Sequence, residues 1–176
     1  AQILEQFEGG LGNDTIDGGA IDIVTQRNGN RANYQYAKSA VTVTLADAAQ
    51  TTSQGSATGG AGNDVLIRIN QVRGSNYGDT LTGSDGKTLT EHFEGMAGKD
   101  TIDGKGGFDV VSYRSAGTGV KVNLAAGAAT QDGYGSVDTL INIEGVFGSK
   151  YKDVLTGGNN ANGSNYTTDV AKIEIF

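Results

Sequence analysis

The chain is 176 residues long, carries a formal net charge of −7 with a pI near 4.6, and contains no cysteine, proline or tryptophan. The acidic balance argues against nucleic acid as a partner and for cation binding. The lack of cysteine excludes disulfides, and no apolar run approaches the ~18 residues of a membrane-spanning helix. Glycine supplies 29 residues, whereas Leu, Ile, Val and Phe together make up roughly a fifth of the chain, so the apolar core is expected to be thin and bound metal is the remaining means of stabilising it.

The first predicted element is a glycine-rich turn in the segment FEGGLGNDTIDG, residues 7–18, and nearly the same segment returns as FEGMAGKDTIDG at residues 93–104. Its core occurs once more as GGAGND at residues 59–64. The glycines permit left-handed backbone angles in a tight turn, which leaves carbonyl oxygens free to point inward, and the Asp that ends the core adds a carboxylate. Two residues later stands an aliphatic side chain that is expected to begin a short strand and fill the interior: Ile16, Leu66 or Ile102.

Between these turns the sequence predicts short strands. The segment Asp22-Ile-Val-Thr matches Asp109-Val-Val-Ser, and VTVTL at residues 41–45 matches VKVNL at residues 120–124. The latter two alternate with period two, as half-buried strands do. Helical periodicity is weak, glycine interrupts every useful window, and β-branched residues dominate the apolar positions, so an all-β chain is predicted.

The strongest internal match aligns residues 64–83 on residues 138–157 without a gap. The apolar and turn residues fall in identical register, which predicts two tandem units, at about residues 1–86 and 87–164. Residues 165–176 include the alternating segment DVAKIEIF and are expected to form an end cap or to begin a next module. Because such repeats cannot bury their apolar rows alone, the units are expected to stack as a β-solenoid.

The pattern GGxGxDxUx, in which U is a large aliphatic residue, resembles the nonapeptide of the RTX calcium-binding repeat family. The longer unit around it is similar to the RTX regions of large bacterial adhesins and other secreted repeat proteins, and the resemblance covers nearly the whole chain. It implies a right-handed parallel β-roll in which neighbouring turns share Ca²⁺ ions, since calcium takes about six to eight oxygen ligands from carboxylates, carbonyls and waters.

The resemblance also implies which residues hold the calcium, namely the glycines that shape the turns and the aspartates that end them. These are Gly10, Gly12, Asp14, Asp22, Gly60, Gly62, Asp64, Asp79, Gly98, Asp100, Gly107, Asp109 and Asp153.

The predicted sites are unequal. Asp100 and Asp109 stand nine residues apart, as consecutive turns require, whereas Asp14 and Asp22 stand eight apart, so the first pair is expected to bind calcium more tightly. Asp138 lacks the glycines of its counterpart Asp64 and is expected to have lost affinity, and Asp79 and Asp153 keep only part of the glycine pattern. The alternative for every one of them is an ordinary turn in which Asp caps its own backbone beside Gly.

The sequence offers little for catalysis. His92 is the only histidine, cysteine is absent, and neither the nucleophile-elbow pattern GxSxG nor a phosphate-binding glycine motif occurs, so no enzyme activity is expected.

The predicted function is therefore a calcium-binding structural or adhesive module of a secreted or cell-surface bacterial protein, exported by type I secretion and folding on calcium binding. Its expected partners are calcium, a polysaccharide or other cell-surface ligand, and neighbouring modules of the same chain, without membrane insertion. The alternative is a carbohydrate-binding accessory module of a secreted polysaccharide-active enzyme, with some of the seven tyrosines forming its binding face.

Overall fold

The computed structural model describes residues 3–22, 24 and 28–158, and within them the chain forms sixteen strands and no helix. The predicted end cap at residues 165–176 lies outside the described residues. In chain order the strands are β1 (Ile3–Phe7), β2 (Thr15–Asp17), β3 (Asn28–Asn33), β4 (Val41–Thr44), β5 (Gln54–Gly59), β6 (Gly62–Ile67), β7 (Gln71–Arg73), β8 (Thr80–Thr82), β9 (Glu91–Glu94), β10 (Thr101–Asp103), β11 (Asp109–Ser112), β12 (Lys121–Asn123), β13 (Ala128–Gln131), β14 (Asp138–Ile141), β15 (Gly145–Phe147) and β16 (Val154–Thr156).

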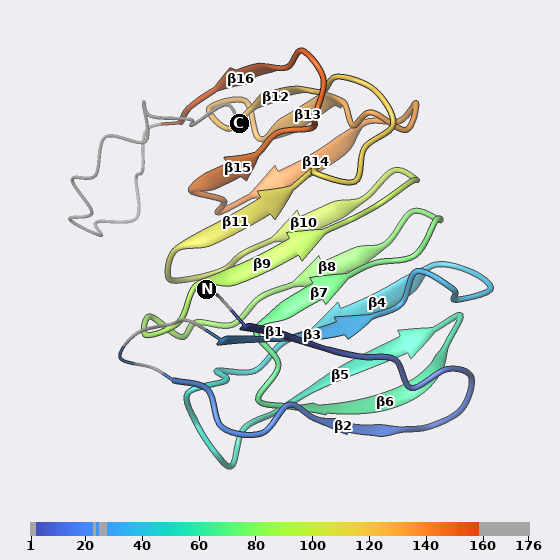
Figure 1. Ribbon diagram of the computed structural model, residues 1–176, viewed down its shortest axis with the longest axis vertical. Coiled ribbons are helices and arrows are strands. Elements are labelled where there is room, and N and C mark those ends of the chain that lie inside the picture. Colours follow the sequence, from blue (N-terminus) through green and yellow to red (C-terminus); the bar gives the residue numbers. More distant parts are fainter. Residues whose placement is uncertain (1–2, 23, 25–27, 159–176) are drawn as a thin grey trace.

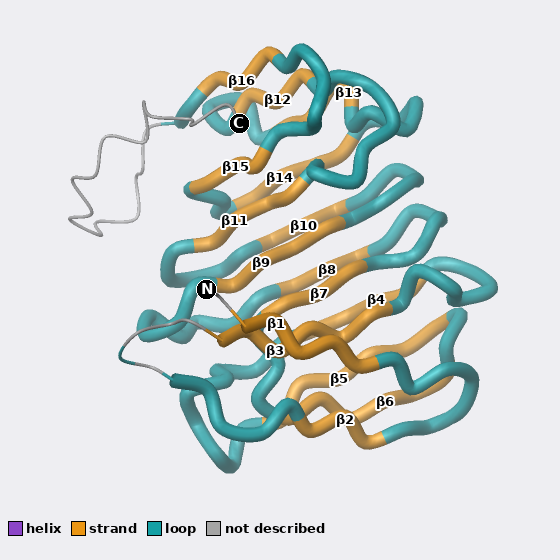
Figure 2. The backbone as a smooth tube through the Cα atoms, viewed as in Figure 1, coloured by secondary structure: helices purple, strands orange, loops and turns teal. Residues whose placement is uncertain are grey.

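The strands form two sheets, which we call the first and second sheet, and the chain passes back and forth between them (Figure 1). The first sheet has the order β1-β3-β7-β9-β11-β15, and all of its neighbours are parallel. The second has the order β16-β12-β13-β14-β10-β8-β4-β5-β6-β2. Strands and glycine-rich connections alternate along the whole stack, and the connections gather at its two edges (Figure 2). The all-β prediction is confirmed.

The second sheet is not wholly parallel, and on this point the predicted parallel roll is wrong. Strand β5 runs antiparallel between β4 and β6, and β13 runs antiparallel between β12 and β14. The reason is the length of the connections, because a strand that follows its neighbour after a short turn must return in the opposite direction. The GGAGND core is such a turn, since Gly59 pairs with Gly62 in a hairpin.

The core lies between the sheets and is built from residues in register. In the second sheet Ile16 is aligned with Leu66, and Leu81 is aligned with Ile102 and Leu140. All five are buried, as predicted for the aliphatic residue after each turn. Facing them, the first sheet contributes one aligned inward row: Ala32, Val72, Phe93 and Val111. Each large member of these rows stabilises the stack by about 1.5–3 kcal/mol, but only when the next strand covers it.

Both halves of the chain use the same strand order. In the first sheet β1, β3 and β7 are followed by β9, β11 and β15, and each half adds five strands to the second sheet with its antiparallel strand in the middle. Strands β6, β7 and β8 correspond to β14, β15 and β16 in the gapless alignment of residues 64–83 with 138–157. The described residues contain no helix that could cross a membrane.

Candidate calcium-binding turns

Three turns between the sheets share one backbone conformation, in which the second and fourth residues have positive φ. The turns are Gly9–Asp14 between β1 and β2, Gly95–Asp100 between β9 and β10, and Gly104–Asp109 between β10 and β11. The angles are 85° at Gly10, 139° at Gly12, 73° at Met96, 122° at Gly98, 66° at Lys105 and 120° at Gly107. We call them the left-handed turns.

Two of these six positions are not glycine. The left-handed conformation costs a residue with a Cβ roughly 1–2 kcal/mol, so Met96 and Lys105 hold it against their own preference. Contacts elsewhere in the turn must therefore stabilise it.

In each left-handed turn the first glycine packs directly on the carboxylate of the last residue. A Cβ added to Gly9 would lie 2.6 Å from Asp14 Oδ2, and one added to Gly95 would collide with Asp100 Oδ2. Gly104 has the same relation to Asp109. Main chain and carboxylate thus approach each other closely in all three turns, and only glycine leaves room for that approach.

Asp100 has a buried carboxylate that is only half satisfied. Its Oδ1 accepts a hydrogen bond of 2.8 Å from the backbone N–H of Asp79, whereas its Oδ2 is buried without a partner. Burial, followed by the charges of Asp138, Asp79 and Asp132, raises the pKa of Asp100 to about 8. The site is therefore short of positive charge.

Asp109 is more extreme, because neither of its buried carboxylate oxygens has a hydrogen-bond partner of normal geometry, although the backbone N–H of Glu91 acts on the carboxylate and opposes the rise of its pKa. Its backbone N–H donates to Glu144 Oε2 at 2.9 Å, which brings a second carboxylate to the turn. Burial, then the charges of Glu91 and Glu144, raises the pKa of Asp109 to about 9. An unpaired buried carboxylate is costly, so this group must either take up a proton or meet a cation.

Asp14 in the first left-handed turn is half-buried, and its Oδ2 also lacks a partner. Its backbone N–H donates to Asp64 Oδ1 at 3.0 Å.

Asp64 accepts a hydrogen bond at each carboxylate oxygen, and metal binding by it stays a prediction. Its two oxygens accept from the N–H of Asp14 and from the hydroxyl of Tyr34, the latter at 3.1 Å. Asp138 repeats this arrangement with the N–H of Asp100 and the hydroxyl of Tyr113, at 3.1 and 2.9 Å. Asp64 and Asp138 are thus braces beside the left-handed turns.

The two tyrosines of these braces were not predicted as partners of the turns. Tyr34 and Tyr113 each stand seven residues before the first valine of the VxVxL strands, and that shared spacing was the available signal. Burial and the neighbouring Asp raise the pKa of both hydroxyls, so they remain protonated donors. The hairpin at Gly60 and Gly62 lies against the first left-handed turn, where Gly12 N–H donates to Ala61 O at 2.9 Å.

Asp79 and Asp153 end a third kind of turn, in which a serine replaces the second residue. Ser75 donates to Asp79 through both its hydroxyl (2.7 Å) and its N–H (2.6 Å). The hydroxyl of Ser149 donates to Asp153 at 2.7 Å. The residues of these two turns have no positive φ. Neutral donors thus reach both oxygens of Asp79 and Oδ1 of Asp153, and metal at these two positions stays a prediction.

The predicted correspondence between Asp22 and Asp109 is wrong, because the structure places Asn30 at that position. Gly18 packs against the side chain of Asn30 as Gly104 packs against Asp109. The N–H of Asn30 donates to Asn70 Oδ1 at 2.9 Å, as that of Asp109 donates to Glu144. The segment from Gly18 to Asn30 is longer than its counterpart, which hid the match. Asp22 is exposed, and its Oδ1 accepts from Val24 N–H at 3.0 Å.

No group of three or more His, Cys, Asp or Glu side chains at metal-binding distances occurs in the part of the chain that the structure describes. Calcium at a left-handed turn would therefore draw most of its oxygens from main-chain carbonyls and water. This matches the chemistry of the turns, which combine one orphaned carboxylate with a closely packed backbone.

A family model for the RTX calcium-binding nonapeptide repeat matches the chain in four copies, at residues 5–20, 56–67 and 92–111. These segments contain the three left-handed turns and the hairpin of residues 59–64. Those segments therefore match the RTX calcium-binding nonapeptide repeat, as the glycine and aspartate pattern predicted. A comparison with curated proteins found no match.

Proposed function

We propose that this chain is a calcium-dependent structural module of a secreted or cell-surface bacterial protein, adhesive in its parent, and that it folds as a right-handed β-roll when calcium fills the left-handed turns after export. The observation that carries the proposal is Asp109, whose two buried carboxylate oxygens have no hydrogen-bond partner of normal geometry. Asp100, with one orphaned oxygen at the opposite edge of the stack, supports it.

Without metal, the folded chain carries an energetic cost at its buried carboxylates. At neutral pH the folded chain must either protonate Asp100 and Asp109 or bury their charges unpaired, and both alternatives lower its stability. A cation that binds only the folded chain stabilises it by mass action. Calcium sites of extracellular modules have dissociation constants of about 10⁻⁴–10⁻³ M, so such turns would stay empty inside a cell and fill outside it.

The proposal assigns no catalytic step to the chain, since RTX repeats are structural calcium-binding repeats. His92 is involved in packing, because its ring stacks on that of Phe147 with centroids 6.0 Å apart. The guanidinium of Arg114 lies 3.9 Å from the centroid of the Phe147 ring. Burial, followed by the charges of Arg31 and Arg114, lowers the pKa of His92 to about 4.

The test is a calcium titration of the purified chain, followed by circular dichroism and calorimetry. We expect little β signal in excess chelator and a cooperative gain of β signal at calcium concentrations of about 10⁻⁴–10⁻³ M. Magnesium at the same concentration is the control, because it demands a tighter octahedral shell than these turns offer. Full β structure in chelator, or no heat of calcium binding, would contradict the proposal.

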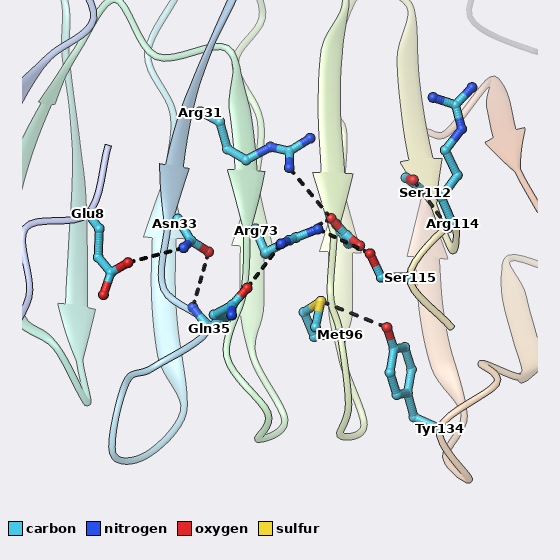
Figure 3. A network of polar contacts seen from close by, with 11 residues as sticks. Glu8, Arg31, Asn33, Gln35, Arg73, Met96, Ser112, Arg114, Ser115 and Tyr134 are labelled. Atoms are coloured by element: carbon cyan, nitrogen blue, oxygen red, sulfur yellow. Dashed lines mark hydrogen bonds and ion pairs between the residues drawn. The ribbon is translucent and has the colours of Figure 1, made fainter. Parts of the chain in front are cut away.

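One observation favours the alternative of a carbohydrate-binding module. The outward face of the first sheet gathers Arg31 and Arg73 around Glu94, with Arg73 Nε 2.8 Å from Glu94 Oε2 (Figure 3). It also carries Arg114, whose guanidinium lies over the ring of Phe147. Guanidinium groups beside an aromatic ring suit the carboxylates and ring faces of an acidic polysaccharide.

Affinity electrophoresis in a polyuronate gel tests this second function. The wild type would be retarded and Arg114→Ala would not, whereas Arg68→Ala, which removes an arginine paired with Asp17 in the second sheet, would behave as the wild type. Equal migration with and without polyuronate would exclude it.

A further inference from the structure

The loop between β13 and β14, residues 132–137, holds a buried aspartate that the RTX pattern does not include. Asp132 Oδ1 accepts three backbone hydrogen bonds from its own loop, from Tyr134, Gly135 and Ser136, at 2.9, 2.9 and 2.8 Å. Its side chain is fully buried, and Oδ2 has no partner. One oxygen is thus fixed by the loop, and the other is left over.

This loop lies against the left-handed turn Gly95–Asp100. The hydroxyl of Tyr134 reaches Met96 Sδ at 3.9 Å, across the second residue of that turn (Figure 3). The charges of Asp132 and Asp100 interact, and Asp132 also acts on Asp138 and on Tyr113. Asp132 therefore belongs electrostatically with Asp100 and Asp138, the pair beside the Tyr113 hydroxyl.

Only two of the three have a free oxygen. Asp138 is fully used, since its oxygens accept from the N–H of Asp100 and from the hydroxyl of Tyr113. The orphaned atoms are Asp100 Oδ2 and Asp132 Oδ2, each on a side chain with no exposed surface. The turn and the loop that contacts it through Tyr134 and Met96 thus each hold one buried carboxylate oxygen without a donor, the kind of group that a cation satisfies.

We propose that Asp132 is a calcium ligand that closes the site of the Gly95–Asp100 turn, so that one ion is held by Asp100 Oδ2, Asp132 Oδ2 and main-chain carbonyls, and ties the β13–β14 loop to the roll. This inference rests on the proposed calcium-binding function and extends it to a residue outside the repeat. The three N–H donors on Oδ1 hold the carboxylate in place before the ion arrives, which lowers the ordering cost of binding.

The other half of the chain supplies the comparison. There the connection between β5 and β6 is the tight hairpin at Gly59–Gly62, which brings no carboxylate to the left-handed turn of Asp14. The structure therefore assigns a two-carboxylate site to Asp100 and a one-carboxylate site to Asp14.

The test is calcium calorimetry on the full chain and its Asp132→Asn variant. Asn keeps an oxygen for the three N–H donors and removes the charge, so the affinity of one calcium equivalent should fall by at least about tenfold while the others stay unchanged. The matched control is Asp17→Asn, because Asp17 Oδ1 caps the N–H of Gly19 at 2.9 Å but is exposed and paired with Arg68. Unchanged binding in Asp132→Asn would overturn the inference and leave the proposed function standing, whereas a wild type that binds no calcium would overturn both.

A second measurement does not depend on the folding of Asp132→Asn. Terbium replaces calcium in oxygen sites and is excited through nearby tyrosines, so Tyr134→Phe should lower the sensitised emission of bound terbium without changing the number of ions bound. Tyr77→Phe, which alters an exposed tyrosine in a serine turn, is the control. Equal loss of emission in both variants, or none in Tyr134→Phe, would contradict the placement of the ion.

Discussion

The two halves of the chain, β1–β8 and β9–β16, have one topology but different chemistry at the same places. Both have the Tyr–Asp brace, at Tyr34 and Asp64 in one and at Tyr113 and Asp138 in the other. In the second half Asp109 ends the turn between β10 and β11, whereas the first half has Asn30 at the corresponding position. The two halves therefore share their apolar rows and the Tyr–Asp hydrogen bonds, whereas the carboxylates at corresponding turns differ.

The largest difference between the halves should appear when each left-handed aspartate is neutralised. In saturating calcium, Asp100→Asn should lower the free energy of unfolding by about 3 kcal/mol, because a bound ion would lose a fully buried carboxylate. Asp14→Asn should cost less, since Asp14 is half-buried, and Asp22→Asn should cost almost nothing. Thermal unfolding at fixed calcium measures all three, and a larger loss for Asp14→Asn would reverse the comparison.

The next largest effect should come from making the first half resemble the second. Asn30→Asp introduces a carboxylate beside Gly18, where Asn30 is fully buried and its Oδ1 already lacks a partner. In chelator this change should destabilise the chain by about 2 kcal/mol through an uncompensated buried charge. Calcium should recover part of that loss, as judged by chemical denaturation with and without the ion. If Asn30→Asp and the wild type were equally stable in chelator, the turns that end at Asn30 and at Asp109 would not be equivalent.

A smaller effect follows from the protons that calcium must displace. In the calcium-free folded chain the pKa values are about 8 for Asp100 and about 9 for Asp109, far above the ordinary value of 3.8 that unfolding restores. Because each of these carboxyls binds its proton more tightly in the folded chain than in the unfolded chain, its contribution to calcium-free stability is greatest below pH ~4. That contribution is lost as pH rises toward 9.

Calcium affinity should change in the opposite sense, because the ion requires the ionised carboxylates. Between pH 6 and pH 8 it should rise by about tenfold or more, and binding at pH 7 should release protons. Calorimetry in two buffers of different ionisation enthalpy measures that release. Affinity that is flat over this range would show that Asp100 and Asp109 are not the ligands.

The smallest effect belongs to the serine turns. Ser75→Ala removes the hydroxyl that donates to Asp79 Oδ1, and the loss should be about 1 kcal/mol with or without calcium. The number of calcium ions bound should not change, because the N–H of Ser75 and of Val41 still hold that carboxylate. A lower calcium stoichiometry in Ser75→Ala would instead support the original prediction of metal at Asp79.

The sequence by itself determined which residues enter the core and where the left-handed turns form. The register of residues 64–83 on 138–157 and the burial of Ile16, Leu66 and Ile102 follow from local pattern, since period-two alternation and glycine spacing act within a few residues.

Only the tertiary structure decided the partners of each carboxylate. The segment GGAGND has the pattern of a calcium turn, but in the structure it forms a hairpin that Asp64 ends. The carboxylate oxygens of Asp64 accept hydrogen bonds from the N–H of Asp14, fifty residues away in the chain, and from the hydroxyl of Tyr34. Asp132 lies outside every repeat, yet the antiparallel strand β13 brings its loop to the Gly95–Asp100 turn, where Tyr134 contacts Met96. In a stacked fold the ligands of one turn come from the next strand of the sheet, and which strand that is depends on pairing between distant segments rather than on local sequence.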